Sequence, residues 1–522
     1  MSRATRTALV RDDRTAYEAA AGAAVGISGI VFVVGLATLL GVVGIDDPVA
    51  GLELSVLFGV VLLALGVTVV GFGMASRLGY VDAAPQPSAG IVAAAAFTGI
   101  WFAVGAAVSG AAGIGTAGRL AVGAVLGGSA FAVTAFPRED VGSTVPVGAV
   151  AGLCGLSLVV GVIGPGWEQA LVGYNATLFG DTVVPVVVLF TSLVTGWSAA
   201  KAYGGFGARG RNVGAYVLIY LVVGSILTVL VGLVAFVTVR GLPGLFGGFS
   251  VGGASLVSWP FLTNGAGLTA DVAGVFPALL GTVWLVIGAV LFAVPTGVGA
   301  AVFLSEYAEQ GRFTGAVEVA TNGLWSTPSI VFGLFGAAFL IPRFGNQKSL
   351  IAGMLTLGFM LLPLVLITSR EAILAVPDEY RDASAALGVS KWKTIRSVVL
   401  PAAIPGIATG VILGVGRIAG ETAPILLTMG GGVLPGKSAA PDVLGGFQLS
   451  GSPPFVSNPA LLEATSALPY QLYALITAGL SGNIENPQEF AWGLALTLLL
   501  VVLVFYAVGI ATRYYFRRKL HQ

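Results

Sequence analysis

The sequence has little charge, one cysteine and one histidine. Only 9% of its 522 residues are charged, whereas soluble domains average about 25%. Hydrophobic residues make up 56% and glycine fills 77 positions, so too few polar side chains remain to cover a water-facing surface of this size. These proportions exclude a soluble enzyme and indicate an integral protein of the lipid bilayer. The formal net charge of +1 provides no basic surface for nucleic acid.

The single cysteine and the single histidine exclude several kinds of chemistry. Cys154 lies in an apolar run and has no second cysteine to pair with, so no intrachain disulfide can form. His521 stands next to the last residue. A Cys/His zinc site, a histidine-based catalytic triad and an HExxH protease site are therefore excluded. We expect no enzymatic activity, no metal and no cofactor in this chain.

Long apolar runs dominate the sequence. A membrane helix needs about 20 mostly apolar residues, and about twelve such stretches occur. They are centred near Phe32, Leu62, Ile100, Leu126, Leu156, Val188, Leu227, Val286, Phe332, Leu357, Val411 and Leu499. The runs are continuously apolar rather than alternating, which argues against a β-barrel. The sequence therefore predicts an all-α polytopic membrane protein with about twelve transmembrane helices.

Basic residues mark alternate loops and thereby predict the orientation. They include Arg77, Arg138, Lys201, Arg209, Arg211, Arg312, several between 370 and 396, and the tail Arg513, Arg517, Arg518 and Lys519. The positive-inside rule places these loops and both termini in the cytoplasm, as expected for a multi-pass protein of the cell membrane. Residues 1–18 carry four arginines before a long apolar run without an obvious cleavage site, which indicates a retained anchor.

A Gly/Arg-rich segment at 208–212 suggests a division of the chain. Residues 1–210 hold about six spans joined by short loops, and the sequence indicates no role for them. Residues 211–522 hold about six more, with two long external loops and one long cytoplasmic loop over 370–400. Asn175 begins a glycosylation sequon in a predicted external loop, and the sequence does not show whether it is used.

Three glycine motifs are expected to have no role in nucleotide binding. Residues 431–438 match the P-loop pattern GxxxxGK[ST], but they follow a membrane helix on the external side, and Pro441 stops any helix after them. Residues 113–118 and 205–210 match GxGxxG without a preceding soluble strand, and a glycine-rich chain produces such matches by chance.

The cytoplasmic segment 377–390 differs from everything around it. It begins with Pro377 and acidic residues and ends at Gly388, which are helix start and stop signals. We predict a short helix along the membrane surface, then a turn, a second run over 391–400, and the next span starting at Pro401. Lipid-anchoring helices favour Trp, Phe and Leu. The alanines and serine in this helix instead favour close docking against another protein.

Several motifs resemble a known family. The spacing of Asp382-Ala383-Ser384, Gly388, Val398 and Leu400-Pro401 resembles the EAA loop of ABC importer permeases, with Asp382, Ser384 and Val398 replacing the family's Glu, Ala and Ile. The stretch Arg417-Ile418-Ala419-Gly420-Glu421-Thr422-Ala423-Pro424 resembles that of PstA-type permeases of phosphate importers. Residues 304–307 and 327–331 also match this family. The resemblance covers about 211–522 and does not reach 1–210.

The resemblance implies a type I ABC importer permease fold for the last six spans. It implies that a cytoplasmic ATPase docks on the short helix, at Arg381, Asp382, Ala383, Leu387 and Gly388. It also implies a PstC-like second permease, PstB-like ATPase subunits that hydrolyse ATP, a PstS-like extracytoplasmic phosphate-binding protein, and phosphate as the solute. Three alternatives remain: an ABC permease for sulfate or molybdate, an ion-coupled secondary transporter, and a channel or membrane scaffold.

Arg417 and Glu421 are charges inside a predicted span. Because they are four residues apart, we expect them on one helix face. Each would cost roughly 2.5–3.5 kcal/mol if exposed to lipid without a partner, so they should pair or face the bundle interior. Arg417 then offers donors to phosphate and Glu421 limits how tightly the anion binds. The alternative is a structural ion pair that locks two helices together.

The segment Ser326-Thr327-Pro328-Ser329 is a second polar interruption. Its hydroxyl groups have one of two roles: they donate hydrogen bonds to the backbone carbonyl that the proline leaves without a donor, or they line an anion path. We therefore add Thr327, Ser329 and Thr422 to the predicted translocation path. Glu306 and Glu371, near the cytoplasmic ends of spans, are expected to be solvated or interfacial.

Overall fold

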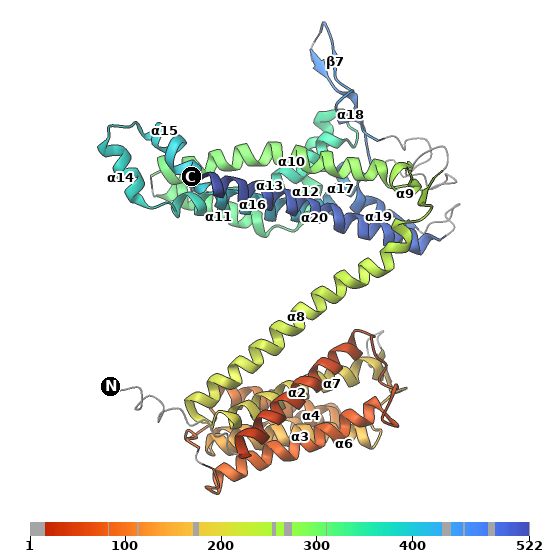
Figure 1. Ribbon diagram of the computed structural model, residues 1–522, viewed down its shortest axis with the longest axis vertical. Helices are drawn as coiled ribbons and strands as arrows, with labels where there is room; N and C mark the ends of the chain where they lie inside the picture. The colour runs from red at the N-terminus through yellow and green to blue at the C-terminus, as the bar shows by residue number, and fades with distance from the viewer. Residues whose placement is uncertain are drawn as a thin grey trace. The chain divides into compact units, whose positions relative to one another are not determined.

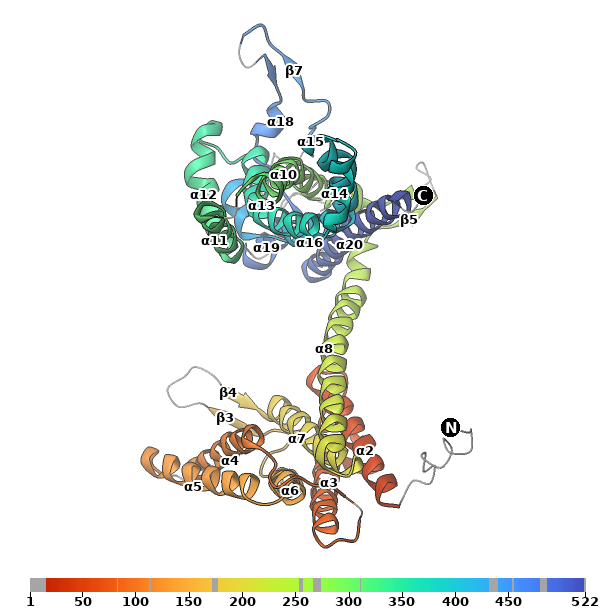
Figure 2. The ribbon, with the colours of Figure 1, turned by 90° about the vertical axis from the view of Figure 1, so that its left-hand side faces the viewer.

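The computed structural model of the protein is built almost entirely from helices (Figures 1 and 2). It describes residues 16–81, 83–111, 114–170, 177–252, 257–265, 274–309, 311–430, 440–452, 455–478 and 486–520. Eleven helices in these ranges are long and apolar enough to cross a membrane, or up to twelve if one bent pair forms a single span. The predicted all-α polytopic fold is confirmed. Four short antiparallel hairpins accompany the helices in the described ranges.

The chain divides into two compact units, Met1–Gly232 and Leu233–Gln522. The division falls within α8 (Gly207–Leu245), a continuous helix of 39 residues. The Gly/Arg-rich segment at 208–212 lies at the start of this helix.

The first unit is a helical bundle. Its elements are α2 (Ala16–Leu39), β1 (Pro48–Val49), β2 (Leu52–Glu53), α3 (Leu54–Arg77), α4 (Ile91–Ala111), α5 (Thr116–Ala135), α6 (Glu139–Val159), β3 (Glu168–Ala170), β4 (Thr177–Phe179), α7 (Gly180–Tyr203) and the first part of α8. Helix α3 packs on α6, and α2 packs on α7. A Cβ at Gly59 or Gly66 of α3 would lie 2.8 Å from a carbonyl oxygen of α6. Glycine is needed at these positions because the two backbones approach so closely.

A buried ion pair and its hydrogen bonds join four segments of the first unit. Lys201 Nζ lies 2.8 Å from Glu139 Oε1, and the two side chains are 1% and 0% exposed. The other oxygen of Glu139 accepts from the backbone N–H groups of Gln86 and Gly207. The expectation that Lys201 belongs to a basic loop is therefore wrong. Lys201 lies in the last turn of α7. Its ammonium group points into the bundle because it pairs with the buried carboxylate of Glu139.

The second unit is built around α13. Its elements are β5 (Ser250–Val251), β6 (Val257–Ser258), α9 (Pro260–Thr263), α10 (Phe276–Val302), the π-helical turn η1 (Phe303–Tyr307), α11 (Arg312–Ser326), α12 (Ser329–Phe335), η2 (Gly336–Leu340), η3 (Ile341–Phe344), α13 (Leu350–Leu374), α14 (Asp378–Ala386), α15 (Lys391–Thr394), η4 (Ile395–Val399), α16 (Leu400–Ala419), α17 (Ala423–Thr428), β7 (Gln448–Leu449), β8 (Val456–Ser457), α18 (Pro459–Leu462), α19 (Leu468–Ala478) and α20 (Pro487–Leu520). Helix α13 packs against α10, α11, α16 and α17. From residue 350 to residue 367 its sequence is almost entirely apolar, as a helix at the centre of a bundle requires.

Two predicted spans of the second unit differ from simple helices. The span centred near Phe332 is broken: residues 312–326 and 329–344 form two helical segments bent by 103°. Pro328 explains the break, because it disfavours helical backbone at the residue before it, and Thr327 is extended with ψ of 132°. The span predicted to start at Pro401 starts at Lys391, as one helical stretch of 29 residues. The π-helical turn η4 ends two residues before Pro401, and such a local adjustment lets a helix continue past a proline.

Candidate functional site

The short cytoplasmic helix predicted between Pro377 and Gly388 is α14. It lies at one end of the second bundle, with α15, and α9 and α19 lie at the opposite end (Figure 1). Gly388 ends the helix with φ of +70°, a left-handed conformation that favours glycine. Its N–H donates to the carbonyl of Ala385, and the N–H of Val389 donates to that of Ser384. These are the hydrogen bonds of a glycine-terminated helix.

Four of the five residues predicted to contact the ATPase lie on an exposed surface. These are Asp382, Ala383, Leu387 and Gly388. Ser384 is buried on the opposite side of the helix. The exposed set combines a carboxylate, two small residues and a protruding leucine, which is a surface that another protein can approach closely.

The fifth residue, Arg381, points inward instead. Its Nε and Nη2 donate to Glu306 Oε1 at 3.1 and 2.8 Å, and its Nη groups donate to the carbonyls of Ile373 and Val376. The side chains of Arg381 and Glu306 are 22% and 8% exposed. The expectation that Glu306 is solvated is wrong, because Arg381 of α14 covers its side chain and compensates its charge. Its interfacial position stays a prediction.

The π-helical turn at the end of α10 contacts both sides of this loop. Glu306 binds Arg381 of α14, and the ring of its neighbour Tyr307 lies 5.0 Å from Lys391 Nζ, at the start of the return helix. Arginine bound to a carboxylate and lysine over an aromatic ring are both favourable contacts. The loop is thus attached to α10 at two points, and we name Glu306, Tyr307, Arg381 and Lys391 the loop clamp.

The predicted pair Arg417–Glu421 forms, but not on one helix face. Helix α16 ends at Ala419, and Glu421 lies in the break before α17 because Gly420 and Pro424 interrupt the helix. The distance from Arg417 Nε to Glu421 Oε1 is 3.8 Å, whereas a charge-assisted hydrogen bond measures about 2.7–2.9 Å. The two side chains are 35% and 19% exposed. The pair is therefore loose and partly exposed on the surface of this chain.

Trp325, which the sequence analysis missed, brings the two polar interruptions together. The guanidinium carbon of Arg417 lies 4.3 Å from the centre of the Trp325 ring, a cation–π contact. Trp325 is in the last turn of α11, directly before the break at Thr327. A tryptophan next to a Ser-Thr-Pro segment was the available signal. We name Trp325, Arg417 and Glu421 the arginine site.

The three hydroxyl residues predicted to line the translocation path are all half-buried. Thr327 and Ser329 flank Pro328, Thr327 follows Trp325 by two residues, and Thr422 directly follows Glu421. The hydroxyl of Thr327 donates to the carbonyl of Gly323, so it satisfies the backbone at the helix break. This contact fits the backbone-satisfying interpretation of that residue.

Some sequence motifs lie outside the described residues. These are the P-loop-like segment 431–438, Gly113 of one GxGxxG match, and Asn175 of the sequon. The match at 205–210 forms the turn into α8, where the N–H of Gly207 donates to Glu139.

Comparison with known proteins identifies the class. The family model described as "Binding-protein-dependent transport system inner membrane component" matches residues 293–522, which contain both the loop clamp and the arginine site. The chain is 37% identical over 199 residues to "Probable ABC transporter permease protein YqgI" of Bacillus subtilis (strain 168), covering 38% of this chain and 68% of that protein.

Two relatives are named PstA permeases. The chain is 37% identical over 233 residues to "Phosphate transport system permease protein PstA 1" of Mycobacterium tuberculosis (strain CDC 1551 / Oshkosh), covering 44% of this chain and 67% of that protein. It is 35% identical over 250 residues to "Phosphate transport system permease protein PstA" of Mycobacterium leprae (strain TN), covering 47% and 72%. A chain in a structure of the MetNI methionine ABC transporter in inward-facing conformations is similar with a TM-score of 0.35 and 18% identity, covering 47% of this chain and 94% of that one.

The chain therefore belongs to the binding-protein-dependent inner membrane transport components, as a PstA-type ABC transporter permease. It is a multi-pass protein of the cell membrane.

Proposed function

We propose that this chain is a permease subunit of an ATP-driven phosphate importer. The observation that carries the proposal is the arginine site: a half-buried guanidinium whose only ion-pair partner among the described residues is a carboxylate 3.8 Å away. A loosely paired arginine is suited to bind an oxyanion, since two parallel N–H groups match two phosphate oxygens. The names of the PstA relatives support phosphate as that oxyanion.

Each residue of the arginine site has a distinct part in this proposal. Arg417 binds the phosphate, and Trp325 supports the plane of its guanidinium group. Glu421 competes with the anion for Arg417 and so keeps binding weak enough for release. Thr327, Ser329 and Thr422 line the path beside it.

The exposed face of α14 is proposed to dock on a PstB-like ATPase subunit, which hydrolyses the ATP. Asp382, Ala383, Leu387 and Gly388 form that contact, and Arg381 holds the helix to α10 through Glu306. Closure of the ATPases would then move the end of α10 together with α14, because the loop clamp joins them. A chain with this role needs no cofactor of its own.

The remaining partners follow from the same proposal. A PstC-like permease completes the translocation path, and a PstS-like phosphate-binding protein delivers phosphate to the external loops. Both termini of this subunit lie in the cytoplasm, on the side of α14. We assign this function to residues 211–522 and regard residues 1–210 as a separate membrane region.

Uptake by the complete complex in proteoliposomes tests the proposal. Labelled phosphate should enter only when ATP is on the ATPase side and the binding protein is on the other, and excess sulfate or molybdate should not compete. Uptake that needs neither ATP nor the binding protein would instead indicate a secondary transporter. Strong competition by sulfate or molybdate would indicate another oxyanion.

A further inference from the structure

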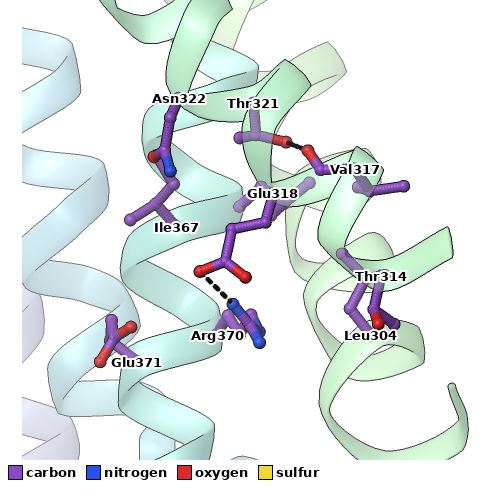
Figure 3. Close-up of a pocket in the computed structure, with 10 residues that line it drawn as sticks. Leu304, Thr314, Val317, Glu318, Thr321, Asn322, Ile367, Arg370 and Glu371 are labelled. Atoms are coloured by element: carbon purple, nitrogen blue, oxygen red, sulfur yellow. Dashed lines mark hydrogen bonds and ion pairs between the residues drawn. The ribbon is translucent and has the colours of Figure 1, made fainter. Parts of the chain in front are cut away.

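A cavity of about 120 Å³ lies between α11 and α13 (Figure 3). Its polar lining includes Glu318 and Asn322 of α11 and Arg370 and Glu371 of α13. Arg370 and Glu371 lie in the last two turns of α13, which lead to α14. The cavity is therefore closer than the arginine site to the end of the bundle that carries α14. A water molecule occupies about 30 Å³ in the liquid. The cavity can therefore hold a small polyatomic ion.

Arg370 lies in this cavity with unused hydrogen-bonding capacity. Its side chain is 19% exposed, and its Nη1 lies 3.4 Å from Glu318 Oε1 (Figure 3). Its Nε is enclosed and has no hydrogen-bond partner among the described residues. A buried donor without a partner has lost its hydrogen bond to water and gained none in return. A ligand that accepts from Nε would replace that hydrogen bond.

Glu318 can release Arg370 at little cost. Its side chain is 55% exposed, so Glu318 is the less enclosed partner of the pair. An ion pair with one exposed partner and a long contact is weakly held. A tetrahedral oxyanion offers two acceptors to Nε and a terminal nitrogen together, which is a stronger arrangement than the single long contact to Glu318. The negative charges of Glu318 and Glu371 would then favour departure of the anion.

The cavity and the arginine site lie along the same face of α11. Glu318 contacts Arg370, and Trp325 contacts Arg417. The two α11 residues are seven positions apart, which is two helical turns and about 10 Å along the axis. An anion released at Arg417 thus has a second arginine two turns further along, and transfer between adjacent weak sites is how conducting pathways combine binding with release.

We propose that Arg370 forms a second phosphate site, on the ATPase side of Arg417, and that Glu318 acts as the competing carboxylate that empties it. The proposal rests on the proposed function of this chain. The opposing interpretation is a structural brace, in which Arg370 and Glu318 only hold α11 to α13. The two interpretations predict different effects of neutralising each residue. A brace weakens when either partner is neutralised. A phosphate site loses affinity for phosphate without Arg370 and gains affinity without Glu318.

Inhibition of uptake by phosphate on the ATPase side tests this difference. Proteoliposomes contain the complete complex with ATP and graded unlabelled phosphate inside, and binding protein with labelled phosphate outside. Arg370→Gln should raise the internal phosphate concentration that halves the initial rate by at least about tenfold. Glu318→Gln should lower it by up to about fivefold. Arg343→Gln removes the same charge from an exposed arginine in η3 and should change nothing.

The outcomes separate the two interpretations. Opposite shifts in the Arg370 and Glu318 variants support the site. Shifts in the same direction, loss of uptake in both, or no shift in either would overturn it. If the Arg370→Gln variant does not assemble, Arg370→Lys replaces it. The direction of its shift is then compared with that of Glu318→Gln, which changes an exposed side chain. If the wild-type complex itself shows no ATP-dependent phosphate uptake, the proposed function fails rather than this inference.

Discussion

Neutralising Glu306 should uncouple ATP hydrolysis from phosphate uptake. Glu306→Gln keeps the size of the side chain but removes the charge that receives two hydrogen bonds from Arg381. A hydrogen bond to a charged group contributes about 1.5–3 kcal/mol and a neutral one about 0.5–1.5 kcal/mol. For two bonds, with Arg381 partly exposed, the attachment of α14 to α10 should weaken by about 2 kcal/mol. That is roughly a thirtyfold larger population of detached loop.

Asp378 provides a matched control, because it contacts the same arginine. Its carboxylate lies 3.1 Å from Arg381 Nη1, but its side chain is 89% exposed, against 8% for Glu306. An exposed pair of this kind contributes less than about 1 kcal/mol. Asp378→Asn should therefore leave the attachment of the loop nearly unchanged, although both substitutions remove one negative charge beside Arg381.

The assay compares phosphate moved with ATP hydrolysed in proteoliposomes that contain the complete complex. Glu306→Gln should retain ATP hydrolysis and lower the number of phosphate ions moved per ATP, and Asp378→Asn should behave as the wild type. Equal effects of the two substitutions would refute the distinction between buried and exposed partners. An unchanged ratio in Glu306→Gln would refute the clamp as the link between α14 and α10.

Three further substitutions test other contacts. Gly388→Arg should abolish uptake and leave membrane insertion intact. A φ of +70° costs a residue with a side chain about 1–2 kcal/mol, and the new cation would lie on the proposed docking face. Normal uptake would count against that face. Arg417→Gln should impair uptake but spare co-purification with the ATPase, whereas lost co-purification would favour a structural ion pair. Lys201→Met should destabilise the first unit by about 3–5 kcal/mol, because it leaves Glu139 buried without its cation, and an unchanged thermal unfolding midpoint would contradict this reasoning.

The fold was largely predictable because the apolar runs are long and the loop signals are local. Every predicted span centre falls in a helix, and the boundaries of α14 follow from Pro377 and Gly388, which act on neighbouring backbone. The 103° bend at Pro328 was not predictable. A proline shows where a helix can break, but the direction of the next segment depends on packing, here of Gly333 in α12 against Pro424 in α17.

The candidate sites were predictable only where their residues are neighbours in sequence. Arg417 and Glu421 were found together because they are four residues apart. Arg381 and Glu306 are 75 residues apart, and their contact exists only because α10 and α13 pack side by side. The position of Trp325 beside the Ser-Thr-Pro segment marks it as a candidate, but only the packing of α11 and α16 shows that its ring contacts Arg417.

The tight ion pairs of the two units have the character of structural contacts. Lys201–Glu139 and Arg381–Glu306 both have nitrogen–oxygen distances of 2.8 Å. In each pair the carboxylate is buried and also tied to backbone groups, directly or through its partner. Removing Lys201 leaves Glu139 with a charge that water cannot reach, so that cost falls on the folded state itself. Neutralising Glu306 costs less, because Arg381 is 22% exposed.

The loose pairs differ in a way that favours exchange. Arg417–Glu421 and Arg370–Glu318 have nitrogen–oxygen distances of 3.8 and 3.4 Å, and at least one partner of each is substantially exposed. Opening such a pair costs less than opening a tight and buried one, and an oxyanion can replace the carboxylate. Neutralising a partner in a loose pair should thus change transport while the thermal unfolding midpoint stays constant. A drop in that midpoint as large as the one expected for Lys201→Met would show that these arginines hold helices together rather than bind phosphate.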